Sequence, residues 1–268
     1  MKKIGFIGCG NMGKAMVCGI LKSGLADGAH MAVSNRHPDK LKDLEEQYGV
    51  AVYTDNKEVA KRSELLVLAV KPELFAEVIA EIRAVVDTST IVIGIAAGVS
   101  MAAMRAMFDR DVKLAKGIPN TPALVQEAMS GVAYGENLSE ADRLAVQELF
   151  ESFGKCCEVK ESMMEAVTVV SGSSPAYLYM ILEAMADGAV LEGMNRKDAY
   201  EFAAQTMLGS ARMLLESGLH PGELKDMVCS PGGTTIEAVA KLEEKGVRSA
   251  IMEAMRTCAD KSRKMSKR

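Results

Sequence analysis

The sequence predicts an α/β protein in which a doubly wound sheet domain is followed by an all-helical domain. Short apolar runs alternate with amphipathic stretches over the first 155 residues, in the order of successive β–α–β units. From about residue 161 the strand pattern stops, and long helical patterns continue to the C-terminus. The chain of 268 residues is 49% hydrophobic, which suffices for a packed core and excludes intrinsic disorder. We therefore expect two domains, residues 1–155 and 161–268.

Strands of the first domain are predicted from short apolar runs. They are expected at residues 4–9, 30–35, 50–53, 65–70 and 90–95, with further candidates at 111–116 and 131–134. The runs at 65–70 and 90–95 lack polar alternation, which is typical of strands buried on both faces of a parallel sheet.

Helices are predicted from apolar residues at helical spacing and from residues that begin or end helices. In the first domain they are expected at 11–23, where Gly24 suits a C-terminal cap, at 38–48, which Pro38 begins, at 56–62 and at 140–153. In the second domain they are expected at 175–194, 196–217, 234–245 and from 247 to the end. The many methionines of this domain indicate adaptable packing between helices, with a soft-metal or promiscuous binding face as the alternative.

The composition argues against several classes of function. With 32 basic and 36 acidic residues the net charge is −4, so no general nucleic-acid binder is expected. The six cysteines form no CxxC pair and the three histidines stand at no metal-ligand spacing. We therefore predict no metal site and a reducing, cytoplasmic environment. The uncharged runs at 88–104 and 166–182 are too short and too interrupted to be membrane spans.

A glycine motif follows the first predicted strand and opens the first predicted helix. Gly8, Gly10 and Gly13 form a GxGxxG pattern, which in this context is the fingerprint of a dinucleotide site in a Rossmann-type sheet. The first glycine permits a tight turn, the second lets the backbone approach a pyrophosphate, and the third lets helix and strand pack closely. The helix N-terminus adds amide donors and a positive dipole for the phosphates. Glycines that only make a turn are the alternative interpretation.

The end of the second predicted strand bears on the choice of cofactor. A site that prefers NAD has an Asp or Glu there, which accepts hydrogen bonds from the ribose hydroxyls. This chain has Ser34, Asn35 and Arg36 instead, a guanidinium beside hydroxyl and amide groups. We therefore predict a 2′-phosphate ligand and NADPH as the cofactor, with NADH possible but weaker. An exposed arginine without a ligand is the alternative.

Two further strand ends are expected beside the nicotinamide half of the cofactor. Residues 69–72 end the fourth predicted strand, and residues 95–98 end the fifth. Ligands of open α/β sheets bind outside the carboxyl ends of the strands, so Lys71 becomes the predicted cation near the reaction centre. A surface lysine ahead of a helix-starting proline is the alternative interpretation of Lys71.

Two clusters of small and hydroxyl residues precede long helices in the second half. One is residues 171–177, and the other is residues 230–235, which spell SPGGTT. Unpaired amides at a helix N-terminus, with added hydroxyls, form a cradle for a carboxylate. Ordinary helix capping explains either cluster alone, but the two together favour a small acidic substrate.

Taken together, these motifs resemble those of the Δ1-pyrroline-5-carboxylate reductases, the last enzymes of proline synthesis. The resemblance is carried by residues 5–12, 69–72, 119–122 and 171–177, and above all by residues 220–235, which include the SPGGTT segment. It implies NAD(P)H-dependent reduction of 1-pyrroline-5-carboxylate to L-proline. It also implies a helical domain that interleaves with its twin in a dimer or a multiple of dimers.

The residue patterns above and the resemblance together assign residues to the site. The cofactor-binding residues implied are Ile7, Gly8, Gly10, Asn11, Met12, Gly13, Ser34, Asn35, Arg36, Asn56, Ala69, Val70, Lys71, Pro72 and Ala97. The substrate-binding residues implied are Glu161, Ser171, Val228, Ser230, Gly232, Gly233, Thr234 and Thr235. The chain departs from the family pattern modestly: Ser174 stands where Gly is common, and Lys116 stands where Arg is more usual.

Reduction of a cyclic imine requires little acid–base machinery. A protonated imine already attracts hydride, so the protein chiefly aligns the cofactor with the imine carbon and holds the substrate carboxylate. No His, Cys or Asp nucleophile is expected. Thr235 is the predicted hydrogen-bond partner or proton donor of the imine nitrogen, and Lys71 is the second candidate catalytic residue. A capping role is the alternative for Thr235.

Three other functions stay open on the sequence alone. The hydroxyacid dehydrogenases also join a glycine-rich Rossmann domain to helices, but they resemble one another in a catalytic Lys on the first long helix of the second domain. Residues 175–194 contain no Lys, which counts against that chemistry. A non-catalytic NADPH sensor is the second alternative, and a reductase of a related cyclic imine is the third.

Overall fold

The computed structural model describes residues 1–266, and the chain folds as two compact units. Unit 1 comprises residues 1–175 together with the chain from Cys258 onward, and unit 2 comprises residues 176–257. Unit 1 extends to Pro175 because the segment after the sheet packs back on it: Met164 shares a small core with Ile118 and Ala133. The predicted functional division at residues 155–161 stays a prediction.

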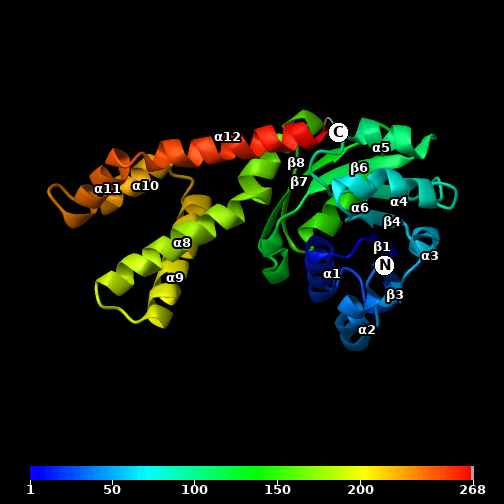
Figure 1. Cartoon of the computed structure of the whole chain (residues 1–268), viewed down its shortest axis with the longest axis horizontal. Coiled ribbons are helices and arrows are strands. Elements are labelled where there is room, and N and C mark those ends of the chain that lie inside the picture. The colour runs from blue at the N-terminus through cyan, green and yellow to red at the C-terminus, as the bar shows by residue number, and fades with distance from the viewer. Residues whose placement is uncertain (267–268) are drawn as a thin grey trace. The chain divides into compact units, whose positions relative to one another are not determined.

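Unit 1 is built on one eight-stranded sheet (Figure 1), whose strand order is β3-β2-β1-β4-β5-β6-β7-β8. The strands from β1 to β6 are parallel, β7 is antiparallel to β6, and β8 is parallel to β7. The strands are β1 Ile4–Ile7, β2 Met31–Ser34, β3 Ala51–Tyr53, β4 Leu65–Leu68, β5 Ile91–Gly94, β6 Lys113–Ile118, β7 Ala128–Tyr134 and β8 Gly154–Glu158.

Helices cover both faces of this sheet, as the doubly wound arrangement requires. Side chains alternate between the faces along each strand, so Phe6 enters one core and Ile7 enters the other. Residues of α1, α2 and α6 fill the first core, and residues of α3, α4 and α5 fill the second. The helices are α1 Asn11–Ser23, α2 Lys42–Tyr48, α3 Asn56–Arg62, α4 Phe75–Ile82, α5 Met101–Phe108, α6 Glu140–Glu151 and α7 Met164–Val167.

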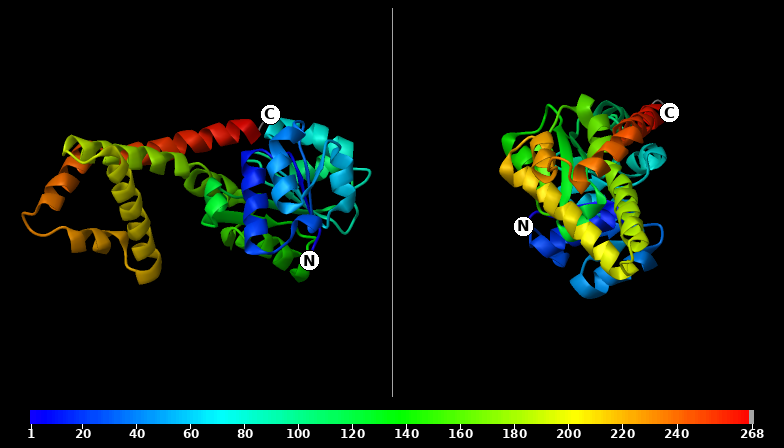
Figure 2. Two further views of the ribbon diagram at one scale, coloured as in Figure 1. Left: turned by 90° about the horizontal axis from the view of Figure 1, so that it is seen from below. Right: turned by 90° about the vertical axis from the view of Figure 1, so that its left-hand side faces the viewer.

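Unit 2 is helical, and two long helices, α8 and α9, are joined in it by a short connection (Figure 2). Of its described residues, the buried apolar side chains are Ala186, Ala199 and Ala203, so unit 2 has no core of large side chains. Helix α8 begins in unit 1, and α12 returns to it, where Cys258 Sγ donates to Ser173 Oγ at 3.3 Å. The helices are α8 Ser174–Leu191, α9 Arg196–Ser217, α10 Pro221–Val228, α11 Thr234–Glu244 and α12 Val247–Ser266.

The predicted fold class is confirmed: a Rossmann-type doubly wound sheet is followed by a helical region. Helices 11–23, 56–62 and 196–217 have the predicted bounds. The helix predicted at 140–153 ends at Glu151, because Gly154 begins β8, a strand that the sequence interpretation missed. Helices α4, α5 and α10 were also not predicted.

The helices and the metal-ligating side chains of residues 1–266 bear on the classes of function. No helix there combines the length and the apolar content needed to cross a bilayer. Within the same residues, no cluster of three or more His, Cys, Asp or Glu side chains could hold a metal ion.

Candidate active site

The glycine turn lies between β1 and α1, where the strand order of the sheet reverses and ligands of such sheets bind. Gly8 has a φ of +84°, and its N–H donates to the carbonyl of Ser34 on β2 at 3.0 Å. Gly10 is the N-cap of α1, which has no side-chain cap and no acidic residue in its first turn. The first amides and the positive end of this helix dipole therefore have no competing anion within the helix.

The surroundings of the three motif glycines differ. A Cβ on Gly8 would lie 2.3 Å from Val70 Cγ1, and one on Gly13 would lie 3.3 Å from Ala69 Cβ. Packing therefore explains these two glycines. A Cβ on Gly10 would meet nothing within 4 Å, so no protein group requires a glycine there. Open space before unpaired helix amides fits a pyrophosphate that approaches the backbone closely.

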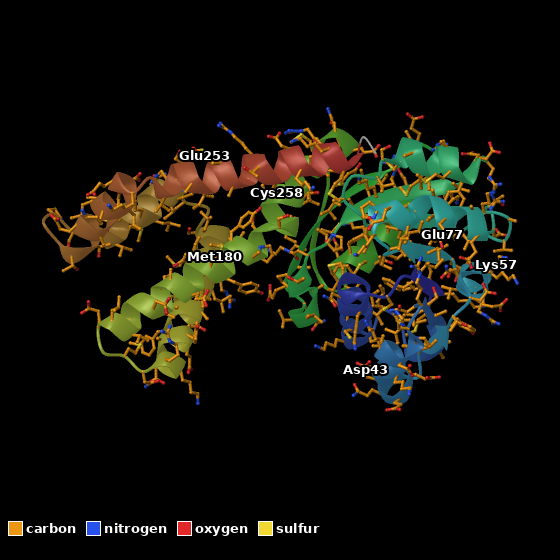
Figure 3. All side chains as sticks on the ribbon, in the orientation of Figure 1. Asp43, Lys57, Glu77, Met180, Glu253 and Cys258 are labelled. Carbon is orange, nitrogen blue, oxygen red and sulfur yellow. The ribbon has the colours of Figure 1, made fainter. Side chains whose placement is uncertain are left out.

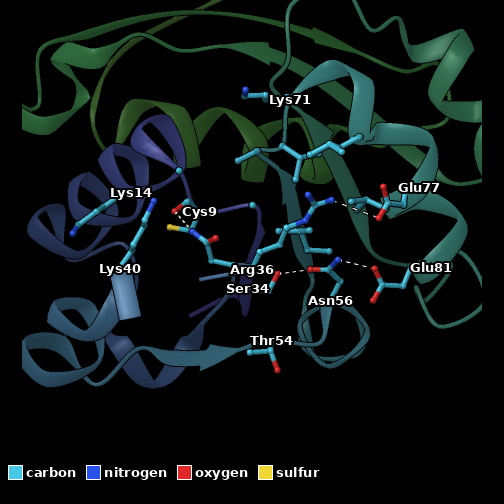
Figure 4. Close-up of a pocket in the computed structure, with 18 of the residues that line it drawn as sticks. Cys9, Lys14, Ser34, Arg36, Lys40, Thr54, Asn56, Lys71, Glu77 and Glu81 are labelled. Atoms are coloured by element: carbon cyan, nitrogen blue, oxygen red, sulfur yellow. Dashed lines mark hydrogen bonds and ion pairs between the residues drawn. The ribbon is translucent and has the colours of Figure 1, made fainter. Parts of the chain in front are cut away.

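A cavity of about 650 Å³ opens at this turn (Figure 4). It brings together most of the predicted cofactor residues: Ile7, Gly8, Gly10, Asn11, Ser34, Asn35, Arg36, Asn56, Ala69, Val70 and Lys71. Met12, Gly13, Pro72 and Ala97 are not among the residues that line it. Gly13 is buried beside Ala69, which directly follows β4, and Ala97 lies three residues after the end of β5.

The cavity also has lining residues that no sequence motif indicates. Lys14 and Lys40 lie on the α1 side, and Glu77 and Glu81 lie on the α4 side (Figure 4). The two glutamates are four residues apart, so they share one face of α4. The amphipathic run 75–82 was the signal that could have found that helix. The other additional lining residues are Cys9, Thr54, Leu74 and Val78.

Hydrogen bonds and an ion pair connect the cavity residues near the ends of β2 and β3 with helix α4. The buried Ser34 Oγ donates to Asn56 Oδ1 at 2.7 Å, and Asn56 Nδ2 donates to Glu81 Oε2 at 2.7 Å. Arg36 forms an exposed ion pair with Glu77, 3.5 Å between nitrogen and oxygen. Asn35 Nδ2 donates to the carbonyl of Cys9 at 3.0 Å and so ties β2 to the glycine turn.

Charged groups near the turn are partly neutralised within the protein. Lys14 pairs with Asp43 of α2 at 2.7 Å, and the hydrogen bond from Lys14 lowers the pKa of Asp43. Cys9 lies inside the glycine motif but is buried, and this burial raises the pKa of its thiol to about 12. A thiol that stays protonated is neither a nucleophile nor a metal ligand.

A second cavity, of about 440 Å³, lies in unit 1 beyond the end of β5. Lys116 of β6 lines it and is buried. This burial lowers the pKa of its ammonium group, and the negative charges of Glu161 and Glu165 offset part of that shift. Glu161 Oε1 accepts a hydrogen bond of 2.6 Å from the Met101 amide at the start of α5. The predicted substrate residue Glu161 therefore caps a helix of the sheet domain.

Ser171, another predicted substrate residue, lies in a π-helical segment, Thr168–Gly172, that leads into α8. Its hydroxyl donates to the carbonyl of Val167 at 3.0 Å, and its own carbonyl accepts from Asn120 Nδ2 at 3.1 Å. Such π segments often occur at functional sites. In this structure the side chain of Ser171 is buried and its hydrogen bonds hold the segment.

The remaining predicted substrate residues lie in unit 2, around the start of α11. Gly233 is the N-cap of this 11-residue helix and offers no side-chain cap, and Gly232 has a φ of +68°. Thr235 is half-buried in the first turn, whereas Val228, at the end of α10, is 66% exposed. Ser230 precedes the turn, and its carbonyl accepts from the Gly233 amide at 3.0 Å.

Comparisons with known proteins find two family models and several relatives that match this chain. Residues 161–265 match the model of the pyrroline-5-carboxylate reductase dimerisation domain, and residues 3–98 match that of the coenzyme F420-dependent NADP oxidoreductases. The pyrroline-5-carboxylate reductase of Escherichia coli strain K12 is 48% identical over 266 residues, 99% of each chain. That of Methanosarcina acetivorans is 44% identical over 267 residues, 100% of this chain and 99% of the relative.

A solved structure gives the same result. The crystal structure of a Plasmodium falciparum pyrroline carboxylate reductase with NADP bound superposes with a TM-score of 0.91 at 29% identity, covering 99% of this chain and 98% of that one. The predicted resemblance is thereby confirmed by both sequence and fold. This chain, with its glycine turn, its cavity and its SPGGTT helix start, belongs to the pyrroline-5-carboxylate reductase family.

Proposed function

We propose that this chain catalyses the NADPH-dependent reduction of 1-pyrroline-5-carboxylate to L-proline, the final step of proline biosynthesis. The cavity at the glycine turn, in a chain of this family, is the observation that carries the proposal. In the reaction, hydride adds to the imine carbon, a proton completes the amine nitrogen, and NADP⁺ is released. NADH is the weaker alternative cofactor.

The residues of the first cavity fit the cofactor. The open space over Gly10 and the amides of α1 would receive the pyrophosphate, with Asn11 in the first turn. Arg36, with Ser34 and Asn35, would face the adenosine ribose and its 2′-phosphate. NADPH, when bound, supplies the hydride. Ile7, Gly8, Met12, Gly13, Asn56, Val70, Pro72 and Ala97 would shape or line the rest of the site.

Lys71 is proposed as the cation beside the reacting centre. Lys71 lies three residues after the end of β4, at the carboxyl end of the parallel strands, and it lines the cavity together with Ala69. No hydrogen bond or ion pair engages its side chain among the described residues, so its charge is available to a ligand. An ammonium group there favours an anionic substrate near the cofactor.

The start of α11 is proposed as the substrate cradle. Gly232 and Thr234 would present backbone amides to the substrate carboxylate, while Gly233 closes the turn through its hydrogen bond to Ser230 at the rim. The Thr235 hydroxyl would contact the imine nitrogen as hydrogen-bond partner or proton donor. We also keep Glu161, Ser171 and Val228 as substrate-site residues.

Unit 2 is proposed to associate with a second copy of this chain. Its large apolar side chains are exposed rather than buried: Met180, labelled in Figure 3, is 71% exposed, Leu191 86% and Leu215 70%. Large apolar side chains exposed in this number favour an interaction face, and the matching family model is that of a dimerisation domain. The second domain, 161–268, would then serve both substrate binding and dimerisation.

The proposed environment is the cytoplasm, and no nucleic-acid partner is proposed. All six cysteines are free thiols, which is typical of a reducing compartment. The net charge of −4 provides no general attraction for a phosphate backbone.

Consumption of NADPH with 1-pyrroline-5-carboxylate tests the proposed function. Fast turnover with this imine, and slower turnover with its six-membered homologue, supports the proposal. Turnover only in the oxidative direction, with a hydroxy acid and NADP⁺, would identify a hydroxyacid dehydrogenase. Binding of NADPH without turnover of any imine would identify a sensor.

A further inference from the structure

The loop that joins β5 to α5, residues 95–100, is tied to the rest of unit 1 mainly at its two ends. Residues 96–99 form no hydrogen bond with any residue that the structure describes. At the start of the loop, the Ile95 amide donates to the carbonyl of Leu68 on β4 at 3.3 Å. Val99 is buried among apolar residues of α4 and α5. The position of the loop therefore depends on the contacts at the start of α5.

Glu161 provides the long-range contact at the start of α5. Its Oε1 accepts a hydrogen bond of 2.6 Å from the Met101 amide, 60 positions away in the sequence. Met101 is the first residue of α5, so the carboxylate also lies at the positive end of that helix dipole. Ser100 is the N-cap and accepts from the Ala103 amide at 3.0 Å. The two side chains therefore satisfy different amides of the first turn.

A buried cation opposes the charge of Glu161. Lys116 of β6 is 6% exposed and lines the second cavity together with Gly98 and Glu161. In the sheet, Lys116 pairs in register with Gly94, the last residue of β5. The charges of Lys116 and Glu161 attract each other, which favours the position of the carboxylate beside α5.

The loop lies where the nicotinamide half of the cofactor is expected. Strand β5 is next to β4, and β4 is next to β1, with all three parallel. The loop after β5 therefore lies at the same edge of the sheet as the glycine turn after β1 and Lys71 after β4. Ala97, a predicted cofactor residue, is in the middle of this loop. A displaced loop would alter the surface offered to the nicotinamide ring and leave the cavity around Arg36 in place.

We propose that Glu161 is a positioning residue for the nicotinamide half of NADPH, because it fixes loop 95–100 through the Met101 amide. This inference rests on the proposed function, since it assigns the loop to the cofactor. No described residue bonds the other carboxylate oxygen of Glu161, so the same side chain can also border the substrate. Glu161 is the first residue of the region that matches the dimerisation model, so this contact links that region to the cofactor site.

The test compares two ligands in the absence of any imine. NADPH contains the nicotinamide, whereas 2′,5′-ADP has only the adenosine half with its phosphates, and calorimetry gives the dissociation constant of each. In Glu161→Ala the advantage of NADPH over 2′,5′-ADP should fall about fivefold, the effect of one lost hydrogen bond, while 2′,5′-ADP binds as before. Glu161→Gln keeps an oxygen that can accept from the Met101 amide, so it should retain most of this advantage.

The amide can also be removed while Glu161 stays in place. Met101→Pro deletes the N–H, and proline is well tolerated at the first residue of a helix. Ser100 already has the extended backbone that suits a residue before proline. Met101→Pro should lower the advantage of NADPH as Glu161→Ala does, and the double variant should show no further loss. Met101→Ala keeps the amide, so it is the matched control and should leave the advantage unchanged.

The outcomes distinguish the inference from the function on which it rests. An unchanged advantage of NADPH in Glu161→Ala, an equal fall in Met101→Ala, or an equal weakening of both ligands overturns the role of Glu161 and leaves the reductase proposal intact. A role of Glu161 confined to the substrate would likewise leave NADPH binding unchanged. Failure of the unsubstituted chain to bind NADPH overturns both the inference and the proposed function.

Discussion

Val70 fills the space that a side chain on Gly8 would need: its Cγ1 lies 2.3 Å from a Cβ built on that glycine. The φ of +84° at Gly8 adds strain for any other residue. Gly8→Ala should therefore lower the free energy of unfolding by about 2–4 kcal/mol, as well as weaken cofactor binding. Chemical denaturation measures the first effect, and titration with NADPH measures the second.

Gly10→Ala is the matched control for this prediction. Nothing lies within 4 Å of its added methyl group, so the stability should fall by no more than about 1 kcal/mol, the loss of a favourable N-cap residue. Binding of NADPH should nevertheless weaken strongly, because the methyl group enters the space assigned to the pyrophosphate. Unchanged NADPH binding in Gly10→Ala would contradict the placement of the phosphates.

Arg36→Glu tests the 2′-phosphate contact. The substitution removes a charge-assisted hydrogen bond and adds a third carboxylate near Glu77 and Glu81, so the KM for NADPH should rise at least about tenfold. The KM for NADH should change far less, because NADH has no 2′-phosphate. Equal effects on the two cofactors in steady-state kinetics would show that Arg36 does not select between them.

Thr235→Ala tests the proposed contact with the imine nitrogen. A hydroxyl that acts in the transition state contributes to turnover more than to binding, so kcat should fall by about tenfold or more with a smaller change in KM. Thr235→Ser keeps the hydroxyl and should restore most of the lost turnover. A loss confined to KM would reduce Thr235 to a positioning role.

Cys9 should be unreactive although it lies in the cofactor turn. Burial raises the pKa of its thiol to about 12, so at about pH 8 the nucleophilic thiolate is essentially absent. Iodoacetamide should modify the exposed Cys157 and leave Cys9 unmodified until the protein is denatured. Peptide mass spectrometry measures both sites, and labelling of Cys9 in the folded protein would refute its assignment as an inert packing residue.

Much of the fold could be predicted because local signals agree with the tertiary structure. Helix 11–23 ends where Gly24 adopts a φ of +76°, and helix 56–62 begins after Asp55, whose side chain accepts from the Lys57 amide. Strand β8 escaped prediction because Gly154–Glu158 is short, half-exposed and contains Lys and Glu. It is an edge strand whose pairing with β7 comes from distant residues.

The glycine motif of the candidate site could be predicted from the sequence, but the two glutamates on its α4 side could not. Residues 8–13 are contiguous and carry their own pattern, whereas Glu77 and Glu81 enter the cavity only because α4 packs beside β1 and β4. The contact between Ser34 and Asn56 joins residues 22 positions apart, and no local pattern encodes it. Unit 1 likewise recruits the end of α12 through contacts such as Cys258 with Ser173, which are 85 positions apart.

The central claim is that this chain transfers hydride from NADPH to the imine carbon of 1-pyrroline-5-carboxylate. The most direct measurement uses NADPH deuterated at the transferred position of C4, with analysis of the amino acid product by chiral chromatography and mass spectrometry. We predict L-proline carrying one deuterium at C5. Formation of no proline, or of proline without the label, would contradict the account.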